Sequence, residues 1–256
     1  MEPDDLARVL SGTAALLRHA HEADSPVKPT EFYNEGWMAA LTLSVAASGV
    51  DLLPFRIAQD ARWWTEALLR SQFNPRRRGD RRGEGLTNAD ALVGHFDRRG
   101  NTKRGVRVRT DATQLICIEA KLGARLSART DNAEGFDQAA RSVACMACEL
   151  DLAGVDVARC TSLAFYVLAP EDTLDFHRPL VSRDSIEARV RARVEQYDDP
   201  RRADLERWVA GPFRSVLDRL TLACVAWESV IARAVAADAD RGRMLGAFYR
   251  ECRRLN

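Results

Sequence analysis

Two acidic residues and one lysine have types and spacing that suit chemistry on phosphate esters: Asp90, Glu119 and Lys121. Glu119 and Lys121 follow the apolar run that starts at Leu115, and side chains two residues apart on a strand point to the same side. If the strand that carries Asp90 pairs with this strand as a hairpin, both carboxylates meet at one edge of the sheet. Two such oxygen ligands suit Mg²⁺, with Mn²⁺ as a substitute, and a nearby ammonium group can orient a metal-bound water. The spacing therefore predicts the parts of a phosphodiester hydrolase.

Lysine is rare in this chain, which makes Lys121 informative. Lys and Arg together number 38, and the only lysines are Lys28, Lys103 and Lys121. A coding bias towards arginine explains the imbalance, and Lys121 is a position that this bias has not changed.

Apolar periodicity predicts the elements that position these residues. We expect strands over 89–96 and 114–121, joined by a polar hairpin loop over 97–113 in which Val106 to Arg109 extends a strand. A long helix over 133–153 and a strand over 161–168 follow.

The flanking regions are mostly helical by the same criterion. Thr30 is the expected N-cap of a helix that Gly49 ends, and residues 50–57 form an expected short strand. The remaining expected helices cover residues 6–21, 32–47, 60–73, 184–197, 202–209, 212–236 and 241–253. This order predicts an α/β core over 31–170, an N-terminal helical segment over 1–30 and a helical C-terminal region over 171–256.

Composition excludes several classes of protein. Hydrophobic residues make up 46% and charged residues 29%, and no apolar run is long enough to span a membrane. The acidic N-terminus is unlike a secretory signal, so we expect a soluble cytoplasmic protein. Cys145 and Cys148 have the spacing of half a zinc site, but no second half follows, and buried helix-face cysteines are the better interpretation. The net charge of +1 does not by itself indicate nucleic-acid binding.

Arginines cluster in the Gly- and Pro-containing stretch 74–85, which we expect to be a loop. Arg76, Arg77 and Arg78 are candidate contacts to a phosphate backbone, and a simple solvated loop is the alternative.

The pattern Asp90, then Glu119-Ala120-Lys121 after an apolar strand, resembles the PD-(D/E)XK nuclease superfamily, whose members have the restriction-endonuclease-like fold. The resemblance covers about residues 31–170. Members of the superfamily often carry a glutamate on a helix before the core strands, where Glu35 stands, and a glutamine on the helix after the lysine strand, where Gln138 stands. The residue before Asp90 is alanine, where the superfamily often has proline.

The resemblance implies a central mixed sheet flanked by helices and a Mg²⁺-dependent nuclease that acts on DNA, with RNA not excluded. It implies that Asp90, Glu119 and the backbone carbonyl of Ala120 bind the metal and that Lys121 positions the attacking water. Glu35 would bind a second metal or its water shell. Gln138 would contact the substrate backbone or orient the site. Restriction, repair and anti-phage defence are the roles that analogy suggests.

Each of these residues also has a structural interpretation. Glu119 and Lys121 could form an exposed ion pair on an edge strand, although the preceding apolar run favours a central strand. Glu35 could be a first-turn glutamate stabilised by the helix dipole. Gln138 could face solvent, and Arg141, one turn further, would share its groove and is a further candidate nucleic-acid contact.

Three functions remain open at the level of the sequence. One is the nuclease. The alternative is a nuclease-like module that binds nucleic acid or serves as a scaffold without cleavage. The third is an all-helical interaction protein in which the pattern Glu119-Ala120-Lys121 is accidental, and it predicts no strand from Leu115 to Lys121. The C-terminal helices could pack on the core, form a homodimer or bind a partner protein, and apolar periodicity does not choose among these.

Overall fold

The computed structural model describes residues 11, 14, 28–75, 80, 82–84, 87–100, 105–127, 133, 135–198 and 200–255. Three of the expected features lie outside these residues: nearly all of the helix over 6–21, most of the N-terminal segment, and Arg76, Arg77 and Arg78.

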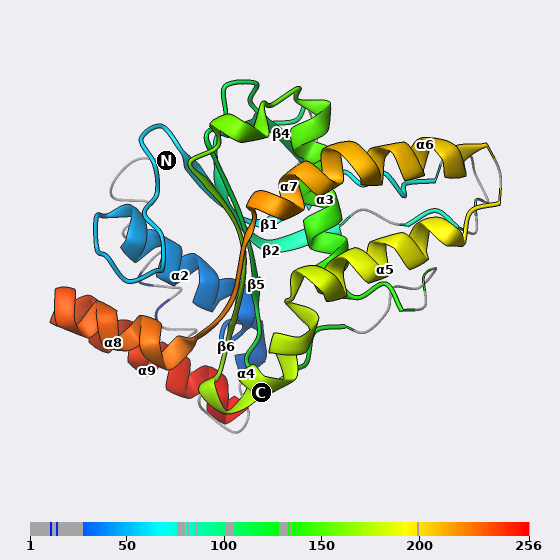
Figure 1. Cartoon of the computed structure of the whole chain (residues 1–256). Helices are drawn as coiled ribbons and strands as arrows, with labels where there is room; N and C mark the ends of the chain where they lie inside the picture. Colours follow the sequence, from blue (N-terminus) through cyan, green and yellow to red (C-terminus); the bar gives the residue numbers. More distant parts are fainter. Residues whose placement is uncertain are drawn as a thin grey trace.

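A five-stranded mixed sheet flanked by helices forms the centre of the molecule, which confirms the α/β class (Figure 1). The strand order is β1-β2-β5-β6-β7. Neighbouring strands are antiparallel from β1 to β5 and parallel from β5 to β7. The strands are β1 (Arg62–Leu69), β2 (Thr87–Gly94), β5 (Gln114–Ala120), β6 (Ser162–Ala169) and β7 (Thr221–Ala226). A separate small hairpin joins β3 (Phe96–Arg98) to β4 (Val106–Val108), as the alternation at 106–109 predicts.

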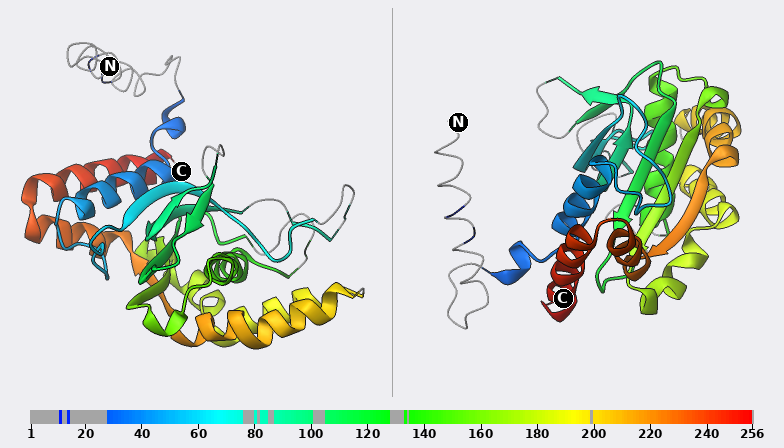
Figure 2. Two further views of the ribbon diagram at one scale, coloured as in Figure 1. Left: turned by 90° about the horizontal axis from the view of Figure 1, so that it is seen from above. Right: turned by 90° about the vertical axis from the view of Figure 1, so that its left-hand side faces the viewer.

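Helices cover both faces of the sheet (Figures 1 and 2). One layer contains α2 (Glu35–Ala47), α8 (Trp227–Ala237) and α9 (Ala239–Leu255). The other layer contains α3 (Gln138–Leu152), α5 (Arg183–Glu195), α6 (Arg201–Trp208) and α7 (Arg214–Arg219). Short helical turns are η1 (Pro29–Glu31), η2 (Val157–Arg159), η3 (Glu171–Thr173), α4 (Leu174–His177), η4 (Arg178–Leu180) and the π-helical turn η5 (Val209–Phe213).

Strand β5 lies at the middle of the sheet, and all of its residues are buried. Leu115 and Cys117 join the core on the α3 side, whereas Ile116 and Ile118 join the core on the α2 side. An uninterrupted apolar run is what a strand covered on both faces needs. The predicted central strand is therefore confirmed.

Helix α2 begins later than the sequence predicts. Asn34, not Thr30, is its N-cap, and the Asn34 side chain accepts a hydrogen bond of 3.0 Å from the Trp37 amide. The expected end is confirmed, because Gly49 takes a φ of +93° just beyond Ser48, the C-cap residue.

The predicted helix over 60–73 is wrong, because most of this segment is strand β1. Trp63 and Trp64 pair with Val93 and Leu92 of β2. Aromatic residues favour strands, and the cross-strand contacts outweigh the helical spacing of the apolar residues.

Two further predictions differ from the structure. Residues 50–57 form no strand, and instead Leu52 and Leu53 insert into the core beside α2. The predicted helix over 212–236 is interrupted by β7, which pairs in parallel with β6. A six-residue apolar run cannot be distinguished from a buried helical segment by periodicity alone. Among the described residues, no helix is both long and apolar enough to cross a membrane.

Candidate active site

The site lies where β2 and β5 separate. Their backbone pairing ends at Ala91 and Ile118, and Asp90 is the next residue on the β2 side. The Asp90 Oδ2 atom accepts a hydrogen bond of 2.8 Å from the Ala120 amide. If β2 and β5 stayed paired for longer, a backbone carbonyl of β2 would accept this hydrogen bond. Here the Asp90 carboxylate accepts it instead.

Lys121 lies against both carboxylates at this point. Its Nζ atom is 3.4 Å from Asp90 Oδ2 and 3.7 Å from Glu119 Oε2. The side chains are 12% exposed in Lys121, 23% in Asp90 and 0% in Glu119. The predicted meeting of Asp90, Glu119 and Lys121 is therefore present in the geometry, and it is not an exposed edge-strand pair.

Glu119 is held by two side chains of α3. The Gln138 Nε2 atom donates to Glu119 Oε2 at 2.5 Å, and the Ser142 hydroxyl donates to Glu119 Oε1 at 2.7 Å. Burial raises the pKa of the Glu119 carboxyl well above its ordinary value of 4.5, and the negative charge of Asp90 raises it further. A buried carboxylate with this environment favours a proton or a cation beside it.

Helix α3 begins at Gln138, which donates a hydrogen bond to Glu119. Asp137 is the N-cap and accepts a hydrogen bond of 2.8 Å from the Ala140 amide, so the first helical residue is Gln138. Ser142 lies four residues later on the same helix face. The sequence interpretation missed Ser142, and the signal that could have found it is this spacing from Gln138.

The segment after Lys121 is fixed by three contacts. The Trp227 indole donates to the Lys121 carbonyl at 2.9 Å, and Arg253 donates to the Leu122 carbonyl at 2.7 Å. At the other end, the Gln138 amide donates to the Ser127 carbonyl at 3.0 Å. Helices α8 and α9 therefore help to position the residues that follow the site lysine.

Glu35 is not joined to the other candidates. It lies half-buried in the first turn of α2 and makes no hydrogen bond or ion pair with Asp90, Glu119 or Lys121 within the described part of the chain. Its role as a ligand stays a prediction. The same is true of the Ala120 carbonyl.

Glu66 is a carboxylate near the site that sequence reasoning missed. In the register of β1 with β2 it stands opposite Asp90, between the pairs Thr65–Ala91 and Ala67–Ala89. Its φ is +55°, an uncommon conformation for a residue with a side chain. No sequence signal marks this residue, because the backbone irregularity arises from pairing between distant strands.

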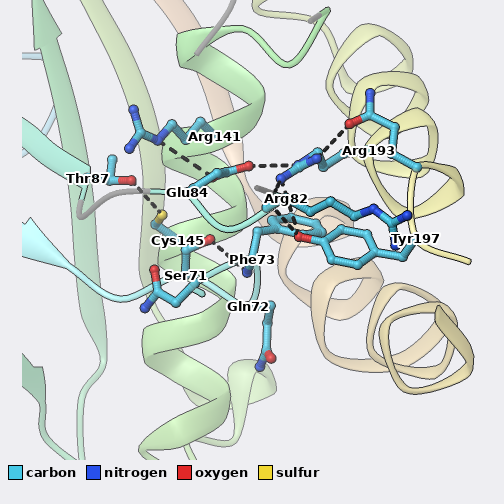
Figure 3. Close-up of polar contacts among 12 residues, drawn as sticks. Ser71, Gln72, Phe73, Arg82, Glu84, Thr87, Arg141, Cys145, Arg193 and Tyr197 are labelled. Carbon is cyan, nitrogen blue, oxygen red and sulfur yellow. Dashed lines mark hydrogen bonds and ion pairs between the residues drawn. The ribbon is translucent and has the colours of Figure 1, made fainter. Parts of the chain in front are cut away.

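Arg141 lies in a buried ion cluster (Figure 3). Its Nε atom is 3.7 Å from Glu84 Oε2, and Arg193 of α5 donates to Glu84 Oε1 at 2.9 Å. Arg193 also donates to the carbonyl of Arg82 and to the hydroxyl of Tyr197. The structure thus gives Arg141 a protein partner, and its contact to nucleic acid stays a prediction.

The described residues contain no group of three or more His, Cys, Asp or Glu side chains arranged to hold a metal. Cys145 and Cys148 are buried free thiols on α3, as the sequence suggests, and burial raises the pKa of Cys145 to about 12. No family model, curated protein or solved structure matches this chain. The chemistry of the site is therefore inferred from its own geometry.

Proposed function

We propose that this protein is a Mg²⁺-dependent nuclease that hydrolyses phosphodiester bonds of nucleic acid, with DNA as the expected substrate. The observation that carries the proposal is the convergence of Asp90, Glu119 and Lys121 where two core strands separate. Paired carboxylates with an adjacent ammonium group match the needs of a reaction at a phosphate, in which negative charge develops on oxygen.

The donor set fits a hard divalent cation better than zinc. Mg²⁺ is usually held by one or two carboxylates and keeps several waters, so Asp90 and Glu119 suffice as protein ligands. Structural zinc needs four nitrogen or sulfur ligands, which the described residues do not bring together here. Lys121 Nζ lies within 3.7 Å of both carboxylates, at the place where a divalent cation would compete with it.

A bound cation would supply Lewis-acid chemistry and a more acidic water. The protein residues would do the rest. Gln138 and Ser142 fix the orientation of the Glu119 carboxylate, so that its oxygens meet the cation without reorganisation. Lys121, released from the carboxylates, would donate hydrogen bonds to the attacking water or to a phosphate oxygen.

The element order supports the restriction-endonuclease-like fold as the finer assignment. Helix α2 precedes the three antiparallel strands, and α3 follows the lysine strand and carries Gln138. These are the places that the resemblance assigns to the two flanking helices. A role in restriction, repair or defence would follow only from the substrate that the enzyme cuts.

The proposal is tested with purified full-length protein, DNA and RNA, and Mg²⁺ or Mn²⁺. We expect cleavage by the wild type and a loss of about a hundredfold or more in Glu119→Ala and Lys121→Ala, because each removes a group that acts on developing charge. The matched controls are Glu195→Ala and Lys28→Ala, which alter exposed residues, and these variants should cut normally.

Two results would contradict the nuclease. One is a wild type that binds nucleic acid and never cuts DNA or RNA with either metal, which favours the binding module without cleavage. The other is cleavage that survives in Lys121→Ala, which would place the active centre elsewhere.

A further inference from the structure

An arginine on an aromatic platform lies in the segment that follows the site lysine. Arg125 lies four residues beyond Lys121, and its guanidinium carbon is 4.0 Å from the centre of the Phe176 ring. Phe176 belongs to α4 and is 50% exposed, and Arg125 is exposed as well. Stacking on an aromatic face fixes the plane of a guanidinium group and leaves its N–H edge free for a ligand.

Arg125 differs from neighbouring arginines in having no acidic partner. In the same region Arg178 pairs with Asp175, and Arg253 pairs with Asp172 at 2.8 Å. Among the described residues, Arg125 forms no ion pair and no hydrogen bond through its side chain. An unpaired, oriented arginine is what a site for an external anion provides.

A buried histidine, His177, lies within the electrostatic influence of both Lys121 and Arg125. His177, next to Phe176, is 1% exposed, and neither ring nitrogen has a hydrogen-bond partner in the structure. Burial lowers the pKa of His177, and the charges of Lys121 and Arg125 lower it further. Of these two cations, Lys121 has the carboxylates of Asp90 and Glu119 beside it, whereas Arg125 has no ion pair among the described residues, so Arg125 is the cation here that can meet an external anion.

We propose that Arg125, stacked on Phe176 in the segment that follows Lys121, binds a backbone phosphate of the nucleic-acid strand that enters the active site. The planar guanidinium can donate two parallel hydrogen bonds to the oxygens of one phosphodiester. Its assignment to the strand being cut rests on the proposed nuclease function.

The chain around Arg125 is organised before the ligand arrives. Leu122 and Ser127, on either side of it, are held by Arg253 and Gln138. Because Gln138 also holds Glu119, the phosphate contact and the carboxylate site share one support. A preorganised contact loses little conformational entropy on binding, which favours affinity.

The test measures binding of fluorescein-labelled DNA, and of RNA of the same sequence, to the full chain in EDTA over a range of salt concentrations. We expect Arg125→Gln to weaken binding about tenfold and to reduce the slope of log K against log salt by about 0.9, the value for one phosphate contact on duplex DNA. Phe176→Leu should weaken binding about threefold, because it removes the platform and keeps the charge. The matched control is Arg233→Gln, which removes an exposed arginine of α8 and should change neither quantity.

The outcomes separate this proposal from the nuclease. If Arg125→Gln and Arg233→Gln give the same affinity and salt slope, or if the wild type binds neither nucleic acid, Arg125 is not a phosphate contact. If inorganic phosphate at equal ionic strength competes as strongly as nucleic acid, the site takes free phosphate and the proposal is overturned. Binding that depends on Arg125 without any cleavage would support the contact and contradict the nuclease.

Discussion

A fully buried carboxylate is expensive for a protein to keep, and Glu119 is such a residue. Ser142, Gln138 and Lys121 offset part of this cost with hydrogen bonds and charge. The pKa of Glu119 nevertheless stays well above its ordinary value, because burial and the nearby Asp90 both disfavour ionisation. Residues that are held at a cost to stability are often those that function requires.

The raised pKa predicts how stability depends on pH without metal. Below pH 4.5 Glu119 is protonated in both the folded and the unfolded chain, so ionisation of this carboxyl takes nothing from the free energy of unfolding. As the pH rises from 4.5 through the higher native pKa, Glu119 ionises first in the unfolded chain, and the free energy of unfolding falls. Glu119→Gln carries no such charge, so it should be more stable than the wild type at neutral pH in EDTA, and less dependent on pH.

Thermal unfolding followed by circular dichroism measures this effect. Each 1 kcal/mol gained should raise Tm by about 2–4 °C for a chain of this size. Glu195→Gln, an exposed substitution of the same kind, is the control. A Glu119→Gln protein that is less stable than the wild type at neutral pH would show that the ionised carboxylate is a net stabilising group.

At the scale of elements, α3 connects the site to a second buried polar cluster. Gln138 and Ser142 contact Glu119, and Arg141, between them in sequence, faces Glu84. Glu84 in turn binds Arg193 of α5, as Figure 3 shows. The cluster therefore ties α5 to the segment that leads into β2 and to the helix that supports the site.

Breaking the Glu84–Arg193 pair should lower the free energy of unfolding strongly. Both side chains are almost completely buried, at 0% and 1% exposure. Arg193→Met should cost about 3–5 kcal/mol, because it removes the nearer of the two arginines beside a buried carboxyl and leaves only Arg141 at 3.7 Å. Urea unfolding gives the value, and Arg191→Met is the matched control on the same helix, because Arg191 is exposed and a surface pair of this spacing, here with Glu187, contributes only about 0.3–0.5 kcal/mol.

A double variant tests whether the pair acts as a unit. Glu84→Gln together with Arg193→Met should cost less than the sum of the two single changes, since the double variant has no buried Glu84 carboxylate left without Arg193. Equal losses in Arg193→Met and Arg191→Met would mean that the cluster is not a support of the fold.

At the scale of the whole molecule, the C-terminal region completes the core. Strand β7 pairs with β6 along six residues, and Trp227 and Arg253 bind the backbone just after β5. The boundary at residue 170 that the resemblance implies therefore cuts through a continuous sheet and its hydrogen bonds.

This arrangement predicts that a chain ending at residue 170 does not fold. It would expose the edge of β6 and the apolar face of α2, and remove the contacts that position the segment after Lys121. We expect insoluble protein or a gradual, non-cooperative thermal transition. A soluble fragment that unfolds cooperatively would show that residues 31–170 are an independent domain.

Local sequence was sufficient for the centre of the fold and for the meeting of Asp90, Glu119 and Lys121. The run Leu115 to Ile118 favours a strand covered on both faces, and alternation then puts Glu119 and Lys121 on one side. The adjacent strand brings Asp90 within reach, because consecutive strands usually pair. Gln138 was expected only from the resemblance, which places a glutamine on the helix that follows this strand.

Contacts between distant segments decided the rest. Strands β1 and β7 exist because β2 and β6 offer them partners, and their own sequences also suit helices. The Glu84–Arg193 pair joins residues 109 positions apart, and Arg125 meets Phe176 of α4. A short segment carries only its own backbone preferences, which are worth a fraction of a kcal/mol per residue, about 0.7 at most for ordinary helix residues. Pairing and burial against remote segments contribute more than this, so only the folded chain determines which conformation these segments adopt.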